Sequence, residues 1–171
     1  RAAYGVMKKA DADYRMEGAY NYFPEFYDDV HDISVSYETP LISHETISRR
    51  QASGSPVTFY TCCGPERPNT FTFSPPAEST FLGLHAAALG FDGYLRWAYN
   101  SWVKDPCVDT RFRTWYSGDS FLVYPTGSSI RFERLVQGIQ DYEKIRILRA
   151  EATPAQQKKL DAILAPFAGN D

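Results

Sequence analysis

VTFYTCC at residues 57–63 and GYLRWAY at residues 93–99 flank PPAESTFLGLHAAAL at residues 75–89, and this stretch decides the fold. The two outer segments are rich in β-branched and aromatic residues, which is typical of strands. The middle segment follows Ser74, opens with two prolines and an acid, and stops at Gly90, which predicts a helix with Ser74 as its cap. A strand, a helix and a strand at this spacing call for parallel strands joined by a right-handed crossover.

Further segments extend this alternation towards the start of the chain. Residues 14–22 and 32–37 predict two more strands. Between them, residues 24–30 predict a short helical turn with a proline near its start. Residues 43–50 predict a helix with Ser43 as its N-cap.

Two more helices are predicted after a long loop over residues 100–128. The first covers residues 129–150 and the second runs from Pro154 to about Ala165. The apolar side of the first helix is predicted to comprise Ile130, Leu135, Val136, Ile139, Ile145 and Leu148. Its charged side chains are predicted to lie on the surface or in a salt-bridge network, at Arg131, Glu133, Arg134 and Asp141.

Four parallel strands fit an open flavodoxin-like sheet or half of a closed barrel. A complete eight-stranded (β/α) barrel takes about 250 residues, so 171 residues would cover half of one with extensions. A glycine-rich phosphate loop after the first strand is absent, which counts against a nucleotide-binding sheet.

The composition narrows the class of partner. The net charge is −3 and no basic stripe is present, which argues against nucleic acid as the main partner. No apolar run reaches the length of a membrane span. Aromatic residues make up 15% of the chain, which fits either an aromatic core or a site that stacks sugar rings.

The cysteines and histidines do not form a recognisable metal motif. Cys62 and Cys63 are adjacent and are interpreted as small residues on a buried strand. Cys107 and the three histidines are scattered, so no metal and no cofactor is predicted. The chain starts at Arg1 without an initiator methionine, so we expect a fragment or a processed form, with any export signal upstream.

Polar and aromatic side chains gather after the third and fourth predicted strands, where α/β folds bind ligands. They form the mixture that a sugar pocket needs, with stacking rings beside planar hydrogen-bonding groups. Trp97 alternates with Leu95 and Tyr99, and the parity of the strand leaves open whether it faces a covering helix or the ligand. Arg96 in a strand requires a buried partner.

Paired carboxyl groups, which a glycosidase normally needs, are not evident. The acids near predicted strand ends are Glu38, Glu66 and Asp119, and no two are adjacent. Asp28 and Asp29 fall in the predicted helical turn and are interpreted as structural. The residues alone therefore indicate a binding surface without a catalytic pair.

Three long segments resemble the C-terminal part of the glycoside hydrolase family 123 catalytic domain, a region also described as domain of unknown function 4091. They are FYTCCGPERPNTFTFSPPAESTFLGLHAAALGFDGYLRWAYNSWVKDP at 59–106, RFRTWYSGDSFLVYP at 111–125 and SSIRFERLVQGIQDYEKIRIL at 128–148. The resemblance implies that residues 1–150 form the C-terminal half, about strands five to eight, of a (β/α)8 barrel. Residues 151–171 would be a C-terminal helix and tail. Two open sheet edges would then favour self-association.

The resemblance also implies a chemistry. Family members are retaining β-N-acetylgalactosaminidases that act on glycosphingolipid-type glycans and use the 2-acetamido oxygen of the substrate as nucleophile. An adjacent Asp-Glu pair on an earlier strand assists them, and no Asp-Glu dipeptide occurs in this sequence. The chain is therefore expected to be the inactive sugar-binding part of such an enzyme, which is often secreted or periplasmic. The alternative is a free-standing carbohydrate-binding or scaffold domain derived from one.

The sugar-binding residues implied by the resemblance lie at the ends of the last two strands. Trp97 would face into the barrel and form the floor of the sugar subsite, and Tyr60 would contact the acetamido group. The full set predicted to bind substrate is Tyr60, Asn69, Arg96, Trp97, Tyr99, Asn100, Trp102 and Asp119, with no catalytic residue among them.

Overall fold

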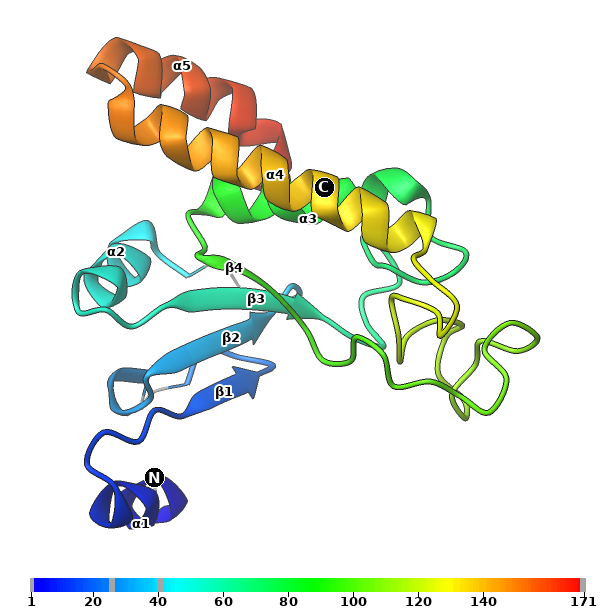
Figure 1. The fold of residues 1–171 in the computed structure, drawn as a ribbon. Coiled ribbons are helices and arrows are strands. Elements are labelled where there is room, and N and C mark those ends of the chain that lie inside the picture. Colours follow the sequence, from blue (N-terminus) through cyan, green and yellow to red (C-terminus); the bar gives the residue numbers. More distant parts are fainter. Residues whose placement is uncertain (1, 25–26, 40–41, 170–171) are drawn as a thin grey trace. The chain divides into compact units, whose positions relative to one another are not determined.

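The computed structural model describes residues 2–24, 27–39 and 42–169 and shows an α/β fold with a four-stranded sheet of order β1-β2-β3-β4 (Figure 1). Its strands are β1 (Glu17–Tyr20), β2 (Asp32–Ser36), β3 (Val57–Thr61) and β4 (Gly93–Arg96). β2 runs parallel to β1 and to β3. The four predicted strands and the α/β class are confirmed, whereas closure into half a barrel stays a prediction.

The strands are shorter than their patterns predicted. β3 ends at Thr61, so Cys62 and Cys63 lie beyond it, half-buried and exposed respectively, and their assignment to a buried strand was wrong. β4 ends at Arg96, so Trp97 begins the following loop rather than continuing the strand. Strand parity therefore does not set the direction of its ring.

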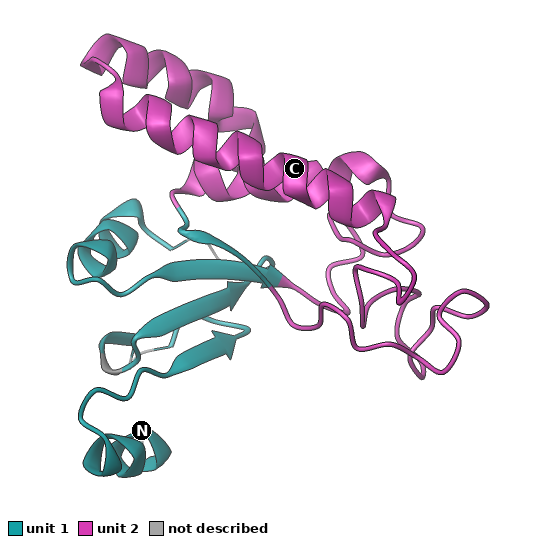
Figure 2. Ribbon diagram, viewed as in Figure 1, with its two compact units in different colours: residues 1–60, 91–95 teal, residues 61–90, 96–171 magenta. Residues whose placement is uncertain are grey.

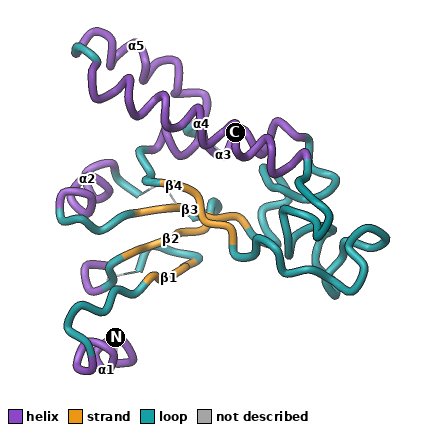
Figure 3. Tube along the Cα trace, in the orientation of Figure 1, coloured by secondary structure: helices purple, strands orange, loops and turns teal. Residues whose placement is uncertain are grey.

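Helices connect and follow the strands (Figure 3). They are α2 (His44–Ala52), α3 (Pro76–Leu89), α4 (Ile130–Glu151) and α5 (Pro154–Leu164), with 3-10 turns η1 (Tyr27–Asp29) and η2 (Ala165–Phe167). These match the predicted helices. An additional helix, α1 (Ala2–Ala10), was not predicted, because it buries no residue and so shows no core-facing pattern. None of the described helices is both long and apolar enough to cross a membrane.

The helix ends confirm two of the three predicted caps. The Ser43 hydroxyl accepts a hydrogen bond from the Thr46 amide at 3.2 Å, and Gly90 ends α3 in the left-handed conformation with φ of 77°. Ser74 does not cap α3, because Pro75 takes the N-cap position. The Ser74 hydroxyl instead accepts from the Phe71 amide at 3.2 Å.

The buried side of α4 differs from the predicted one. Arg131, Leu135 and Gly138 are buried, whereas Ile130 is 69% exposed and Ile139 and Leu148 are also exposed. The hydrophobic periodicity did not predict the buried face of α4, because close packing against α3 determines which residues are buried. A Cβ atom added to Gly83 of α3 would come within 2.1 Å of the Gly138 carbonyl oxygen, so the two backbones cross almost in contact.

The described chain divides into two compact units, coloured separately in Figure 2. Unit 1 comprises residues 1–60 and 91–95, and unit 2 comprises residues 61–90 and 96–171. The predicted boundary at residue 150 lies within unit 2, and a separate C-terminal part at residues 151–171 stays a prediction.

The core of unit 1 lies on the sheet. Ile33, Val35 and Val57 are fully buried, and the Phe59 ring packs against Phe91 at a centroid distance of 5.5 Å. Arg50 of α2 is also buried, and burial lowers its pKa. Its guanidinium donates to the backbone carbonyls of η1 and of the residues before β2, which ties α2 to that turn.

The core of unit 2 joins α3 to α4, α5 and the long loop before α4. Its fully buried side chains include Phe71, Leu82, Phe121 and Leu122. His85 of α3 is buried and its ring nitrogen Nδ1 lies 2.8 Å from the Phe167 carbonyl oxygen. Burial lowers the His85 pKa, so this contact is made by a neutral ring near neutral pH.

The crossing of α3 and α4 predicts opposite effects of the same substitution at two helical glycines. Gly83→Ala should lower the free energy of unfolding by about 2 kcal/mol or more, because the new methyl group meets backbone that cannot move aside. Gly5→Ala in α1 should raise it by roughly 0.5 kcal/mol, because nothing lies within 4 Å of the added atom. Urea denaturation measures both, and equal effects would contradict the crossing.

Candidate functional site

Five of the eight residues predicted to bind substrate lie in the loop that follows β4 and runs to α4. Asn100 pairs with Phe121 in an antiparallel bridge, and the Leu122 amide donates to the Tyr99 carbonyl at 2.8 Å. The two ends of the loop are therefore joined at its base. The structure brings Arg96, Trp97 and Asp119 together there, although 22 residues separate the last two in the sequence.

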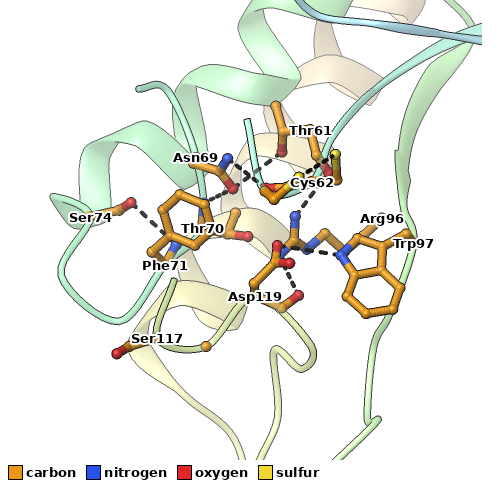
Figure 4. A network of polar contacts seen from close by, with 12 residues as sticks. Thr61, Cys62, Asn69, Thr70, Phe71, Ser74, Arg96, Trp97, Ser117 and Asp119 are labelled. Carbon is orange, nitrogen blue, oxygen red and sulfur yellow. Dashed lines mark hydrogen bonds and ion pairs between the residues drawn. The ribbon is translucent and has the colours of Figure 1, made fainter. Parts of the chain in front are cut away.

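A buried ion pair forms the centre of this cluster (Figure 4). Arg96 Nη2 donates to Asp119 Oδ1 at 2.7 Å, and the two side chains are only 5% and 1% exposed. The same guanidinium donates to the Asp119 carbonyl at 2.5 Å and to the Thr61 carbonyl at 2.8 Å. The predicted need of Arg96 for a buried partner is thus met by Asp119.

Trp97 is attached to the same carboxylate. Its indole nitrogen Nε1 donates to Asp119 Oδ1 at 3.3 Å, while the side chain as a whole stays 41% exposed. One edge of the ring is therefore fixed and one surface remains open to solvent. A ring held in this way can act as a stacking platform, because little side-chain freedom is lost when a ligand binds.

Asn69 connects the loop after β3 to α3. Its side-chain amide donates to the Cys62 and Pro65 carbonyls at 3.0 and 2.6 Å, and it is fully buried. Its backbone amide donates to the Glu78 carboxylate at 2.8 Å. The amide group that was predicted to contact sugar is thus engaged by the protein itself and shapes the loop.

Arg131 was predicted to lie on the surface of α4 or in a salt-bridge network, whereas the structure buries it against backbone carbonyls. It is buried, and its Nη1 donates to the Thr70 and Gly118 carbonyls at 2.5 and 2.9 Å. Burial lowers its pKa, and the nearby Arg96 lowers it further, against a raising effect of Tyr124. The sequence signal was its spacing of four and seven residues from Leu135 and Gly138, which places all three on one helix face.

The remaining predicted residues of the loop carry exposed rings. Tyr99 and Trp102 are exposed, and Trp102 Nε1 donates to the Val123 carbonyl at 2.8 Å. Tyr99 contacts Phe132 edge-on at 5.5 Å. Tyr60, in unit 1, is buried, and its hydroxyl donates to Asn21 Oδ1.

Two further aromatic residues of the same loop are outside the predicted substrate-binding set. Trp115 contacts Trp97 with ring centroids 5.1 Å apart, and the Tyr116 hydroxyl hydrogen-bonds Glu66 Oε2 at 3.3 Å. Both side chains are partly exposed. The run of Phe112, Trp115 and Tyr116 was the available signal in the sequence.

The titratable groups suggest no metal centre. Within residues 2–24, 27–39 and 42–169, no cluster of three His, Cys, Asp or Glu side chains could hold a metal ion. Cys62 and Cys63 are free thiols with sulfur atoms 3.7 Å apart. Although Cys63 is exposed overall, partial desolvation of its thiol and the neighbouring Cys62 raise its pKa, which keeps the thiol protonated near neutral pH.

Two apolar grooves lie elsewhere in unit 2. One of about 370 Å³ is lined by residues of α4 and α5 such as Leu148 and Ile163, and one of about 500 Å³ by Thr80 and Phe81 of α3 with Arg134 of α4. None of the eight predicted substrate-binding residues lines either groove. The loop cluster is the better candidate site, because it combines open rings with oriented polar groups.

Comparison with known proteins identifies one family. The family model described as glycoside hydrolase 123, catalytic domain, matches residues 1–148. A solved structure of a family 123 glycoside hydrolase from Clostridium perfringens, described in connection with glycolipid glycan hydrolysis, matches with a TM-score of 0.77 and 27% identity. The match covers 91% of this chain and 29% of that protein's chain. None of the curated proteins matches.

The buried ion pair leads to a prediction about stability. Asp119→Ala should lower the free energy of unfolding by about 3–5 kcal/mol, because it leaves the Arg96 charge buried without a partner. The double variant Arg96→Met with Asp119→Leu should recover most of this loss, because neither charge of the pair remains. Denaturant titration followed by tryptophan fluorescence measures these variants and the single variants Arg96→Met and Asp119→Leu. A loss in the double variant equal to the sum of the two single losses would show that the two side chains do not depend on each other.

Proposed function

Because this chain belongs to glycoside hydrolase family 123, we propose that it is the sugar-binding part of a larger glycosidase. The matched structure is more than three times as long as the region it shares with this chain, so activity is proposed for a complete protein that contains it. The substrate class is a glycan with a terminal β-linked N-acetylhexosamine, and N-acetylgalactosamine is the sugar that the family resemblance favours.

The proposed reaction is retaining and substrate-assisted. The 2-acetamido oxygen of the substrate attacks the anomeric carbon while a general acid protonates the leaving oxygen. An Asp-Glu pair would orient the acetamido group and supply the acid. No such dipeptide occurs among the 171 residues, so the proposal assigns the pair to another part of the complete protein.

Trp97 is the observation that carries this proposal. It is an open ring whose orientation is fixed by a buried carboxylate, at the carboxyl end of a strand in a parallel sheet. Ligands of α/β folds bind at that end. We assign Trp97 to the floor of the sugar subsite, with Tyr99, Asn100 and Trp102 beside the sugar hydroxyls.

The buried members of the predicted set have a supporting role in this proposal. Arg96, Asp119 and Asn69 are buried and hydrogen-bonded within the protein, so they would position the rings and the loops. Arg96 Nε and Asp119 Oδ2 make no hydrogen bond, but both atoms are buried away from solvent. Their contribution to binding is preorganisation of the site.

The test is hydrolysis of 4-nitrophenyl β-N-acetylgalactosaminide by the complete protein and by this chain under the same conditions. Activity of the complete protein alone would support a binding half whose catalytic acids lie elsewhere. Activity of the isolated chain would contradict the proposal that the catalytic acids lie outside it. Inactivity of both, with sugar binding by this chain on a glycan array, would favour a carbohydrate-binding role.

Substitution of Trp97 tests the site itself. Trp97→Ala in the complete protein should lower kcat/KM by about tenfold or more, because a stacking face and a fixed ring edge are both lost. Val108→Ala is the matched control, since Val108 is an exposed apolar residue of the same loop and makes no ring contact with Trp97. Equal kcat/KM values for the two variants would show that Trp97 does not bind the substrate.

A further inference from the structure

Cys62 and Cys63 are two free thiols on consecutive residues, directly after the end of β3. Their sulfur atoms lie 3.7 Å apart, with Cys62 half-buried and Cys63 exposed. Successive side chains of a regular strand point to opposite faces, so two thiols within a strand would not meet in this way. The Cys62 amide donates to the Gly64 carbonyl at 3.0 Å, and this turn brings the two sulfur atoms to one side of the chain.

A bond between the two sulfur atoms requires a local rearrangement. The atoms would close from 3.7 Å to about 2.05 Å. Adjacent Cα atoms are about 3.8 Å apart, which is shorter than the roughly 4.4–6.8 Å found across most disulfides. The closed ring contains the peptide group between Cys62 and Cys63, so this group must rotate to accommodate it. A disulfide of this kind is strained and exposed, and such disulfides are the easily reduced ones.

The protein already uses the peptide group that would rotate (Figure 4). The Cys62 carbonyl accepts a hydrogen bond from Asn69 Nδ2 at 3.0 Å, and Asn69 is fully buried. Asn69 Oδ1 in turn accepts from the Thr70 amide at 2.8 Å. Rotation of the Cys62 carbonyl would leave a buried amide hydrogen without an acceptor, which destabilises a folded protein. Closure of the ring would therefore disturb the loop that Asn69 shapes.

We propose that Cys62 and Cys63 form a reversible redox site, which a low-molecular-weight disulfide oxidises to a bond between the two sulfur atoms. The dithiol form keeps the Cys62 carbonyl on Asn69, and the oxidised form releases this contact and weakens the loop after β3. This redox site is separate from the proposed function, because no step of it depends on hydrolysis of a glycan.

The oxidation takes place in two thiol–disulfide exchanges. The exposed Cys63 thiol loses its proton to solvent, and its thiolate attacks one sulfur atom of the oxidant. The disulfide bond of the oxidant breaks, one thiolate leaves, and Cys63 carries a mixed disulfide. The Cys62 thiol then loses its proton, and its thiolate attacks the Cys63 sulfur and displaces the second thiolate. In total the two cysteines lose two protons and two electrons, and the oxidant is reduced to two thiols.

Peptide mapping of the complete protein after treatment with oxidised glutathione tests the site. Trypsin releases residues 51–96 as one peptide with both cysteines and no other, because Pro68 prevents cleavage after Arg67. This peptide should be lighter by two hydrogen atoms, should resist alkylation, and should regain both thiols when reduced glutathione is added. A stable glutathione adduct on Cys63, a bond to another cysteine, or two unchanged thiols would overturn the proposal.

A single-cysteine variant is the matched control. Cys62→Ser leaves Cys63 without a partner thiol, so the reaction should stop at the glutathione adduct and release one glutathione where the wild-type protein releases two. Because partial desolvation and Cys62 raise the Cys63 pKa, the wild-type reaction should be faster at about pH 9 than at about pH 7. Equal release of glutathione by the two proteins would show that the ring does not close and would overturn the proposal.

Hydrogen exchange measures the effect of oxidation on the loop. The Asn69 and Thr70 amides donate to the side chains of Glu78 and Asn69, and their exchange should become about tenfold faster in the oxidised protein. The amides of α2, in unit 1, are the internal control and should exchange at an unchanged rate. Unchanged exchange of Asn69 and Thr70 in protein whose two thiols are oxidised would overturn the release of the Asn69 contact.

Discussion

The ion pair between Arg96 and Asp119 is the interaction on which the arrangement of the candidate site depends. Both charges are almost completely out of water, where an unpaired charge is costly. The guanidinium offsets this cost with a carboxylate and two backbone carbonyls, from Asp119 and Thr61. It thereby connects the end of β3 and the end of β4 to the far end of a long loop.

A hydrophobic pair of similar volume can replace a buried ion pair in some proteins without loss of stability. A hydrophobic pair has no acceptor, however, and here the Asp119 carboxylate also receives the indole N–H of Trp97. The same group therefore closes the loop and sets the direction of an exposed ring. The stability of the loop and the orientation of the Trp97 ring are coupled through one carboxylate, which explains how an exposed aromatic ring can stay ordered outside regular secondary structure.

The sequence predicted the order and kind of the elements well, because strand composition, proline and glycine positions and the Ser43 cap are local signals. The sequence-based prediction failed where the burial of a residue depends on a contact with residues far along the chain. The buried face of α4 is chosen by the glycine contact with α3, and Arg131 is buried because its acceptors lie at residues 70 and 118. Helix periodicity contains neither piece of information.

In the candidate site too, local sequence signals predicted some features, whereas others depend on residues far apart in the sequence. Trp97, Tyr99 and Trp102 were predicted from their place in and just after the strand predicted at residues 93–99, and Arg96 was recognised as needing a partner. Trp115 was left out of the predicted substrate-binding set, because its contact with Trp97 depends on the folding of the loop. Asn69 and Asp119 were included in that set, but their internal hydrogen bonds depend on tertiary contacts that no local pattern contains.

The two buried arginines also bear on how such a loop can change during evolution. Arg96 and Arg131 attach the loop through residues 118 and 119 and through its start, and they bind backbone carbonyls as well as one side chain. Carbonyl acceptors survive substitution of the residues that carry them. Most of the stretch between these anchors can therefore mutate without disturbing the framework, so the exposed side chains of this surface loop can change while its attachment to the rest of unit 2 is kept.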